Sequence, residues 1–282
     1  MSIFKGLNSV QRSFTFLSLL AVVGLPLYFL FAYRLFLIPS SGMAPTIPVS
    51  SVVLVHYTQN LGRNDLVLFL KPNQSKGEVL WIKRLVGLPG DYLEIQNGIS
   101  IVNGETFDPV NELWFNYLLK DVQPNKSILN EREYQITAVQ DEIQIKMTEK
   151  EAEKVVAALN AKSYERVILP KGFLQAAVYG SSSSHEWNID FWGPVTVPAR
   201  DATVEITPAN WSWLKPVING YEEANLDILV LPADNPDKVL AQYTFKQNYY
   251  FVMGDNRHNS FDSRFIGFIP EELLKGKIVH VF

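Results

Sequence analysis

The sequence predicts a mainly β protein: an antiparallel β core with an inserted α+β lobe and one N-terminal transmembrane helix. Three features support this fold class: a long uncharged apolar run near the N-terminus, short β-branched runs after it, and one isolated amphipathic helix in the middle of the chain. With 282 residues, 47% of them hydrophobic, the chain has enough apolar side chains for a substantial core.

The apolar run extends from Ser13 to Tyr33 without a charged residue. At about 1.5 Å per helical residue it can cross a hydrocarbon layer about 30 Å thick, and Pro26 is compatible with a kinked membrane helix. The alternative is a cleavable secretory signal, whose apolar region is shorter, usually about 7–15 residues, and ends at small residues that this run lacks. We therefore expect a tail at 1–13 and a transmembrane helix at 14–33.

Charges beside the run predict its orientation. Lys5 and Arg12 precede the run, whereas only Arg34 follows it directly. Because positive charges favour the cytoplasmic side, the tail is expected in the cytoplasm and the remainder of the chain outside it. The absence of cysteine is compatible with an oxidising compartment. Membrane lipid is thus an expected partner.

The charge pattern excludes some classes of function. The net charge is −4, and no Lys/Arg cluster of the kind that neutralises phosphates occurs, so nucleic acid is not an expected partner. The four histidines, at positions 56, 185, 258 and 280, lack the spacing of metal ligands. We expect neither a metal nor another cofactor.

The β core is predicted from short runs bounded by turn residues. Asn97-Gly98 is the strongest hairpin signal because a type I′ turn favours this pair between two strands. A helix is expected from Glu149 to Ala161, with Thr148 and Glu151 as its capping box. The predicted strands are 51–57, 65–70, 79–86, 92–96, 99–102, 249–253 and 277–282.

Three polar blocks, at 38–46, 81–91 and 254–264, lie within this β-rich sequence. The long stretch that separates the last two predicts an insertion at 106–240 in a core formed by 35–105 and 241–282. The third block, Gly254-Asp-Asn-Arg-His-Asn-Ser-Phe-Asp-Ser-Arg264, is dense in side chains that are rarely buried unless each has a partner. It therefore predicts a hydrogen-bonded site.

Read with Ile38-Pro-Ser-Ser-Gly-Met-Ala-Pro-Thr46 and Trp81-Ile-Lys-Arg-Leu-Val-Gly-Leu-Pro-Gly-Asp91, this block resembles the motifs of type I signal peptidases, serine endopeptidases with a Ser-Lys dyad. The resemblance covers the predicted core and hardly touches the insertion. It implies a single-pass protein of the bacterial inner membrane, with its catalytic domain on the periplasmic side. Its expected activity is the removal of signal peptides from exported precursor proteins, which are its expected partners.

Lys83 is the candidate general base. A lysine serves as a base only when neutral, which requires that burial lower its pKa by several units. Lys83 alternates with apolar neighbours in a strand-like run, as such burial requires. The resemblance also implies that Lys83 is the base and that Ser260 orients it by a hydrogen bond.

The first block departs from the family pattern at the nucleophile. The family resembles Pro-Ser-Gly-Ser-Met, with the attacking serine before methionine, but this chain has Gly42 before Met43. The resemblance still implies that Ser40 and the Gly42 amide hold the oxyanion. Two interpretations remain: Ser41 attacks after a local shift, or the chain is an inactive relative that binds precursors or partners. We expect Ser41 to attack, although neighbouring side chains in extended backbone face opposite ways.

Other roles follow from the same resemblance. Residues expected to contact the small side chains before a cleavage site are Ile38, Pro39, Met43 and Ile82. Residues expected to support the site are Asp255, Asn256, Arg257, Asp262 and Arg264. His258 also permits a Ser-His-Asp triad, although a loop histidine is more often a solvent-facing hydrogen bonder. A protease dedicated to one pilus or secretion system would differ only in its substrate.

Overall fold

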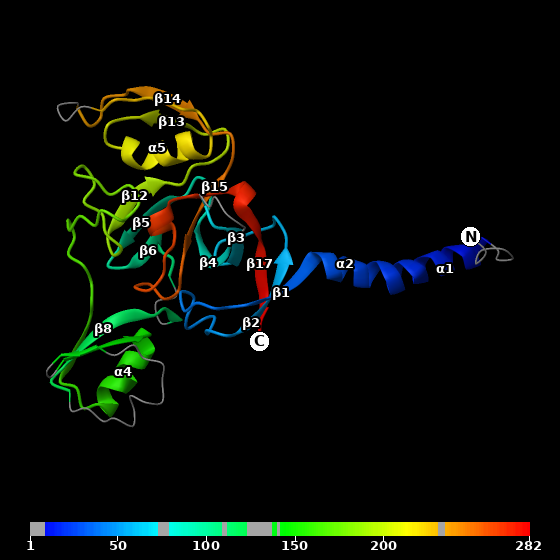
Figure 1. The fold of residues 1–282 in the computed structure, drawn as a ribbon, viewed down its shortest axis with the longest axis horizontal. Coiled ribbons are helices and arrows are strands. Elements are labelled where there is room, and N and C mark those ends of the chain that lie inside the picture. The colour runs from blue at the N-terminus through cyan, green and yellow to red at the C-terminus, as the bar shows by residue number, and fades with distance from the viewer. Residues whose placement is uncertain (1–8, 73–78, 109–111, 123–136, 140–141, 231–234) are drawn as a thin grey trace.

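The computed structural model describes residues 9–72, 79–108, 112–122, 137–139, 142–230 and 235–282. Antiparallel sheets form the body of the molecule, and a long N-terminal helix projects from it (Figure 1). The predicted fold class, mainly β with an antiparallel core, is confirmed.

The N-terminal helix comprises α1 (Ser9–Leu19), a π-helical turn η1 (Leu20–Gly24) and α2 (Leu25–Ala32). Pro26 lies in the first turn of α2, where it has no N–H to donate, and the wider π turn directly before it accommodates that missing bond. Among the described residues, Ser13–Ala32 is the one helix long and apolar enough to cross a membrane, and none of the other described residues buries it.

The observed helix ends at Ala32, one residue before the predicted end of the transmembrane segment at residue 33. Tyr33 begins strand β1 (Tyr33–Leu37), where it pairs with His56 and its ring stacks on the imidazole with 4.6 Å between ring centroids. The apolar run therefore passes directly from the helix into the edge of the main sheet.

The main sheet positions the site. Its strand order is β1-β2-β17-β3-β4-β15-β16, and its neighbours are antiparallel. The remaining strands are β2 (Val52–Tyr57), β17 (Leu274–Val281), β3 (Leu66–Leu70), β4 (Leu80–Gly87), β15 (Tyr249–Met253) and β16 (Ile269–Pro270). Because β4 lies between β3 and β15, its second half is buried, including Lys83 and Arg84. The polar block at 81–91 lies largely on β4, and the block at 254–264 directly follows β15. Because these two strands are neighbours, the two blocks lie close together.

A second sheet extends the core, with the order β12-β5-β6-β7. Its strands are β12 (Trp192–Thr196), β5 (Tyr92–Gln96), β6 (Ile99–Val102) and β7 (Glu105–Thr106). The predicted hairpin between β5 and β6 is confirmed, because Asn97 and Gly98 have φ angles of 53° and 75°, as a type I′ turn requires. The predicted β5, β6 and β15 match the observed bounds, and the other predicted strands agree within a few residues.

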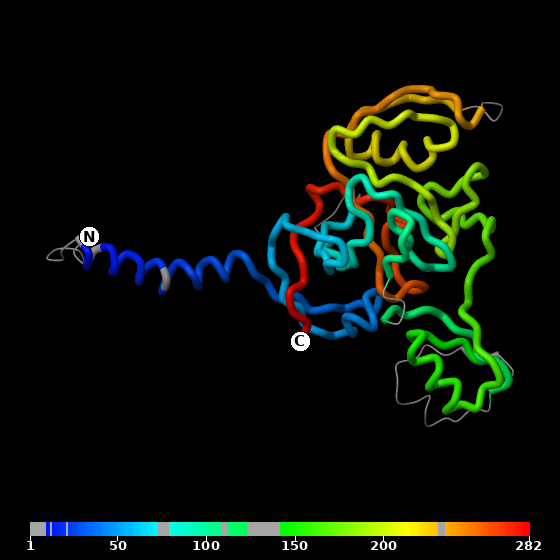
Figure 2. Tube along the Cα trace, turned by 180° about the vertical axis from the view of Figure 1, so that it is seen from behind, coloured from blue at the N-terminus to red at the C-terminus, as the bar shows by residue number. Residues whose placement is uncertain are grey.

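Two helix-and-sheet units lie on opposite sides of the β core (Figure 2). They are built from residues 106–240, predicted as one lobe, together with the next strand, β14, at 241–244. The first unit has the sheet β11-β8-β10-β9 and helix α4 (Glu149–Ala158), which pack around a separate cluster of buried hydrophobic side chains. Its strands are β8 (Phe115–Lys120), β9 (Thr137–Val139), β10 (Glu142–Met147) and β11 (Ser163–Arg166). The predicted capping box at Thr148 and Glu151 is present. The division of the chain into core and insertion stays a prediction.

The second unit places helix α5 (Trp211–Gly220) beside a two-stranded antiparallel sheet of β13 (Thr203–Ile206) and β14 (Ala241–Thr244). Leu214 and Val217 of α5 share one hydrophobic cluster with Leu93 and Phe251 of the core strands. After β15, the loop of the third block leads into α6 (Ser263–Ile266) and, later, the short helix η3 (Glu271–Leu273).

Candidate active site

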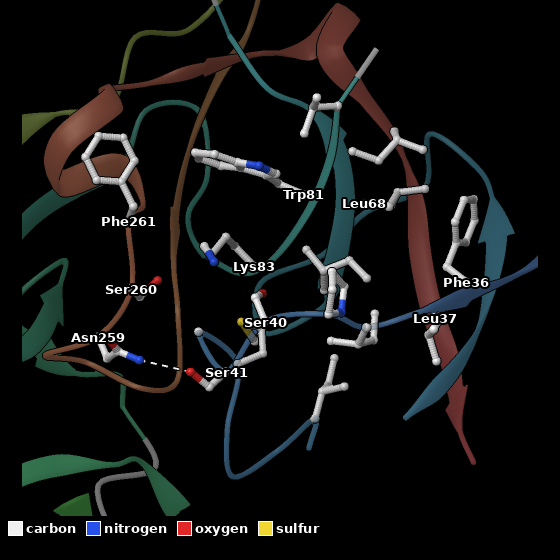
Figure 3. Close-up of a pocket in the computed structure, with 18 residues that line it drawn as sticks. Phe36, Leu37, Ser40, Ser41, Leu68, Trp81, Lys83, Asn259, Ser260 and Phe261 are labelled. Carbon is white, nitrogen blue, oxygen red and sulfur yellow. Dashed lines mark hydrogen bonds between the residues drawn. The ribbon is translucent and has the colours of Figure 1, made fainter. Parts of the chain in front are cut away.

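A pocket of about 460 Å³ lies where the segment after β1, strand β4 and the loop after β15 meet (Figure 3). Its lining is largely apolar, with a few polar groups, as is usual for binding sites. Phe36, Ile38, Met43, Leu68, Trp81, Ile82 and Phe261 contribute to the apolar part, and Ser40, Ser41, Lys83, Asn259 and Ser260 supply the polar side chains. All four residues predicted to contact substrate, Ile38, Pro39, Met43 and Ile82, line this pocket.

Lys83 lies in the pocket with only 7% of its surface exposed. Within the part of the chain that the structure describes, its amine makes no hydrogen bond, and it lies 5.9 Å from the centre of the Trp81 ring. Burial lowers the pKa of Lys83; Asp262 opposes this effect, and Arg264 adds to it. The amine is therefore more readily neutral than that of an exposed lysine, as a general base requires.

Position 42 is the one that faces this amine. A Cβ atom on Gly42 would lie 3.1 Å from Lys83 Nζ and 3.7 Å from both the Asn259 carbonyl oxygen and Ser260 Oγ. The φ of Gly42 is outside the left-handed region, so its backbone does not require glycine. A side chain at this position would thus point at Lys83, and this chain has none.

Ser41 is directed elsewhere. Asn259 Nδ2 donates a hydrogen bond of 2.9 Å to Ser41 Oγ, and Figure 3 shows the Ser41 side chain pointing toward Asn259. The backbone is held as well, because Asn256 Nδ2 donates to the Ser41 carbonyl at 3.1 Å and the Asn256 N–H donates to the Gly42 carbonyl at 3.2 Å. Among the described residues, no hydrogen bond joins Ser41 to Lys83. The Ser40 hydroxyl lies on the Lys83 side of this segment (Figure 3).

Ser260 lies beside the lysine without bonding to it. The side chain is buried, and its Oγ has no hydrogen-bond partner within the described ranges of the chain. The hydrogen bond that was expected from Ser260 to Lys83 is therefore not formed. The hydroxyl instead faces the space next to Gly42.

A buried ion pair ties β4 to the loop of the third block. Arg84 Nε donates to Asp255 Oδ1 at 2.8 Å, and the Arg84 terminal nitrogen donates to Asp255 Oδ2 at 2.5 Å. Thr46 Oγ1 donates to the same carboxylate at 2.5 Å. A buried bidentate pair allows little movement of either side chain. Because Thr46, Arg84 and Asp255 come from different motif blocks, these contacts hold the three blocks in a fixed arrangement.

Two further arginines of the third block hold this loop, Arg264 by a pair within the loop and Arg257 by a pair to another part of the chain. Arg264 makes a bidentate pair with Asp262, whose Oδ2 also accepts the Gly254 N–H at 3.0 Å. Burial alone would raise the pKa of Asp262, but Arg264 holds it below its ordinary value. Arg257 makes a fully buried bidentate pair with Asp108, at 2.5 and 2.7 Å. Both carboxylates are thus bonded to arginine and are not available as bases.

His258 is held in a different network. Its Nδ1 accepts the Asn116 N–H at 3.1 Å, so Nε2 carries the proton that is shared with Asp190 Oδ1 at 2.8 Å. Both ring nitrogens are occupied, which leaves none for a serine, and the triad interpretation fails. The expectation of a solvent-facing side chain is also wrong, because only 5% of the side chain is exposed.

Sequence reasoning missed several residues of the site. Thr46 and Asn259 lie inside quoted motif blocks, beside residues that were singled out, so their position was a usable signal. Asp108 and Asp190 gave no such signal, because each meets its partner only through the fold, across 149 and 68 residues respectively.

Comparison with known proteins identifies the family of the chain. Residues 10–176 and 196–282 match the family described as Signal peptidase, peptidase S26. The chain is 25% identical over 269 residues to signal peptidase I of Buchnera aphidicola subsp. Schizaphis graminum, covering 89% of this chain and 68% of that protein. It is 24% identical over 306 aligned positions to signal peptidase I of Buchnera aphidicola subsp. Baizongia pistaciae, covering 99% and 78%.

A shorter match has a higher sequence identity. Over 48 residues, 17% of this chain, the identity to signal peptidase I of Aquifex aeolicus reaches 48%, although the match covers only 19% of that protein. The family match includes all three motif blocks and most of the chain. The chain belongs to the signal peptidase family, peptidase S26.

Proposed function

We propose that this protein removes signal peptides from exported precursor proteins, with Lys83 as the neutral general base. The observation that carries the proposal is a buried lysine amine, with its pKa lowered, at an apolar pocket of a signal peptidase fold. An apolar pocket of limited size accepts small side chains and rejects large ones by steric clash. Ile38, Pro39, Met43 and Ile82 are the residues proposed to contact the peptide before the cleaved bond.

The oxyanion would be held at the start of the same segment. The Ser40 hydroxyl is exposed on the Lys83 side, and within the described chain no hydrogen bond uses the Gly42 N–H. Two donors of this kind stabilise the charge that develops on the carbonyl oxygen. Lys83 would accept the proton of the attacking oxygen and return it to the leaving amine.

Attack by Ser41 stays a prediction from the sequence. It requires that the Ser41 hydroxyl give up its hydrogen bond to Asn259 and turn toward Lys83. The Asn259 bond is exposed, so breaking it costs only about 1 kcal/mol. A shift of the backbone is the harder requirement, because Asn256 donates hydrogen bonds to the carbonyls of both Ser41 and Gly42.

A second candidate function is binding without cleavage. The observation in its favour is Gly42, because the position that faces Lys83 carries no hydroxyl. Such a protein would capture precursors or partner proteins in the same pocket. The intact Arg84–Asp255 and Asp262–Arg264 pairs preserve the site geometry in either case.

The proposed setting is the bacterial inner membrane. The helix Ser13–Ala32 would be the single anchor in lipid, with the β domain on the periplasmic side. Of the charges that predict this orientation, Lys5 lies outside the described residues, and Arg34 lies on β1 directly after the helix.

The test uses the full chain in lipid vesicles with a precursor that carries a signal peptide. Cleavage is followed by mass spectrometry of both products. The proposal expects cut sites preceded by Ala or another small residue, and Lys83→Met should abolish the products. Stable capture of the precursor by the unmodified chain, without products at any pH from 6 to 10, would instead establish the binding function.

A further inference from the structure

We propose that the attacking oxygen belongs to a water molecule held beside Gly42, between Lys83, Ser260 and Asn259. This inference rests on the proposed peptidase activity and changes its chemistry: the peptide bond is hydrolysed directly, without an acyl-enzyme. Gly42 then has a role of its own, which is to leave space for the water.

Three polar groups surround the site of this water. Gly42, Lys83, Asn259 and Ser260 line the same pocket. A Cβ atom on Gly42 would point toward all three polar groups, at 3.1 Å from Lys83 Nζ and 3.7 Å from the other two, so the absence of that atom lets a water lie at van der Waals distance from the Gly42 Cα on this side. A buried water needs two to four such partners within a small polar space. Gly42 lies in a turn that is closed by the Ala44 N–H donating to the Ser41 carbonyl at 3.0 Å. Its φ is outside the left-handed region, so the turn does not require glycine, and its lack of a side chain is what distinguishes it.

The donors and acceptors match a water molecule. Ser260 Oγ is buried and has no hydrogen-bond partner in the described residues, although a buried hydroxyl left unpaired costs free energy. It can donate to the water oxygen. Neutral Lys83 can accept one water proton through its lone pair, and the Asn259 carbonyl can accept the other. Burial, which lowers the pKa of Lys83, favours the form of the amine that this arrangement needs.

Ser41 is less well placed than this water. Its hydroxyl bonds to Asn259 Nδ2 at 2.9 Å, and its carbonyl bonds to Asn256 Nδ2 at 3.1 Å. Both contacts turn Ser41 toward the loop after β15, whereas position 42 faces the Lys83 amine. A water beside Gly42 thus lies next to the Lys83 amine without any rearrangement of the chain.

The reaction step balances without a further reagent. The water oxygen bonds to the carbonyl carbon of the cleaved peptide as one water proton moves to Lys83 Nζ. The carbonyl oxygen becomes an oxyanion, which accepts hydrogen bonds from Ser40 and the Gly42 N–H. Collapse of this intermediate breaks the C–N bond, and the Lys83 ammonium gives its proton to the leaving amine. The products are a carboxylic acid and an amine, and the lysine returns to its neutral form.

The test compares four forms of the full chain in vesicles on one signal-peptide substrate: the unmodified protein, Gly42→Ala, Gly42→Ser and Ser41→Ala. A methyl group at residue 42 would lie 3.1 Å from Lys83 Nζ and displace a water from that side of the amine. Gly42→Ala should therefore lower turnover by at least about 10²-fold, the scale of a lost catalytic group. Ser41→Ala should lower it less than about threefold. Circular dichroism and thermal unfolding of each form control for folding.

Hydroxylamine identifies the pathway, because it intercepts an acyl-enzyme and gives a hydroxamate. The unmodified chain should give only the carboxylic acid, whereas Gly42→Ser, which restores a hydroxyl facing Lys83, should give hydroxamate and a covalent adduct in acid-quenched samples. Loss of turnover in Ser41→Ala, or hydroxamate from the unmodified chain, would overturn the water mechanism and leave the peptidase proposal standing. No turnover by the unmodified chain, with activity in Gly42→Ser, would overturn the peptidase proposal itself.

Discussion

At the scale of single residues, close approach of backbone segments decides the geometry around Lys83. Gly254 shows this most clearly: a Cβ there would collide with Ser260 and with the Gly42 carbonyl oxygen. The two motif segments can therefore meet only because residue 254 has no side chain. The sequence shows this glycine within the third block but not the segment against which it packs.

Gly254→Ala should accordingly push Ser260 and Gly42 apart. We expect a loss of stability of about 1–3 kcal/mol, as for other overpacked sites, and a loss of cleavage larger than that loss explains. Gly220→Ala is the matched control, because no atom lies within 4 Å of the added Cβ. Urea unfolding and cleavage rates measure both variants, and normal cleavage by Gly254→Ala would show that the close approach is not needed.

Single residues also show how far sequence reasoning reaches. The burial of Lys83 could be predicted, because its neighbours in the strand are apolar and a central strand excludes water. The orientation of Ser41 could not, since it depends on Asn259, which is brought near only by the fold. The unpaired state of Ser260 likewise depends on packing across two segments.

At the scale of elements, the loop after β15 is fixed by buried ion pairs to other parts of the chain. Arg257 reaches Asp108, just after β7, and neither side chain is exposed. The same carboxylate accepts the Ser100 N–H of β6 at 2.6 Å. The second sheet thus supports the loop that carries Asn259 and Ser260.

Asp108→Ala should therefore leave a buried Arg257 charge without its partner. We expect a destabilisation of about 3–5 kcal/mol, measured by denaturant unfolding. Glu165→Ala is the control, because its pair with Lys120 is exposed and should contribute no more than about 1 kcal/mol. Replacement of both buried partners, by Asp108→Leu with Arg257→Met, should recover much of the loss; equal losses in Asp108→Ala and Glu165→Ala would argue against this support.

Elements with a strong local signal could be predicted, and the others could not. The β5–β6 hairpin and the start of α4 follow from an Asn-Gly turn and a capping box, which act over four residues or fewer. Helix α5 was not predicted, because Pro216 and bulky tryptophans disfavour a helix locally and its stability comes from burial of Leu214 and Val217 against the core.

At the scale of the whole molecule, the N-terminal helix leads directly into the main sheet. Helix α2 ends at Ala32, β1 begins at Tyr33, and the pocket begins at Phe36 (Figure 1). A site so close to the end of an apolar helix suits a substrate that is itself anchored by an apolar segment. Signal peptides, whose apolar region is about 7–15 residues long, are substrates of this kind.

The proposed topology predicts that protease added to intact spheroplasts digests the β domain. The helix at 14–33 would keep the N-terminal tail inside, as the positive charges before it favour. Antibodies to an N-terminal and a C-terminal tag follow the two parts separately. Protection of the C-terminal tag until the membrane is broken would reverse the proposed orientation.

The most direct test of the account is the pH dependence of kcat/KM for signal-peptide cleavage, measured for the unmodified chain and for Lys83→Met. Because the base acts only when neutral, the rate should rise with pH and level off above the pKa of Lys83. Burial lowers that pKa, so the rise should end below the ordinary lysine pKa of about 10.4. Lys83→Met, which keeps the apolar stem, should remain folded and show no cleavage at any pH. Cleavage by Lys83→Met, or a rate that falls through this range, would contradict the role of Lys83 as the neutral base.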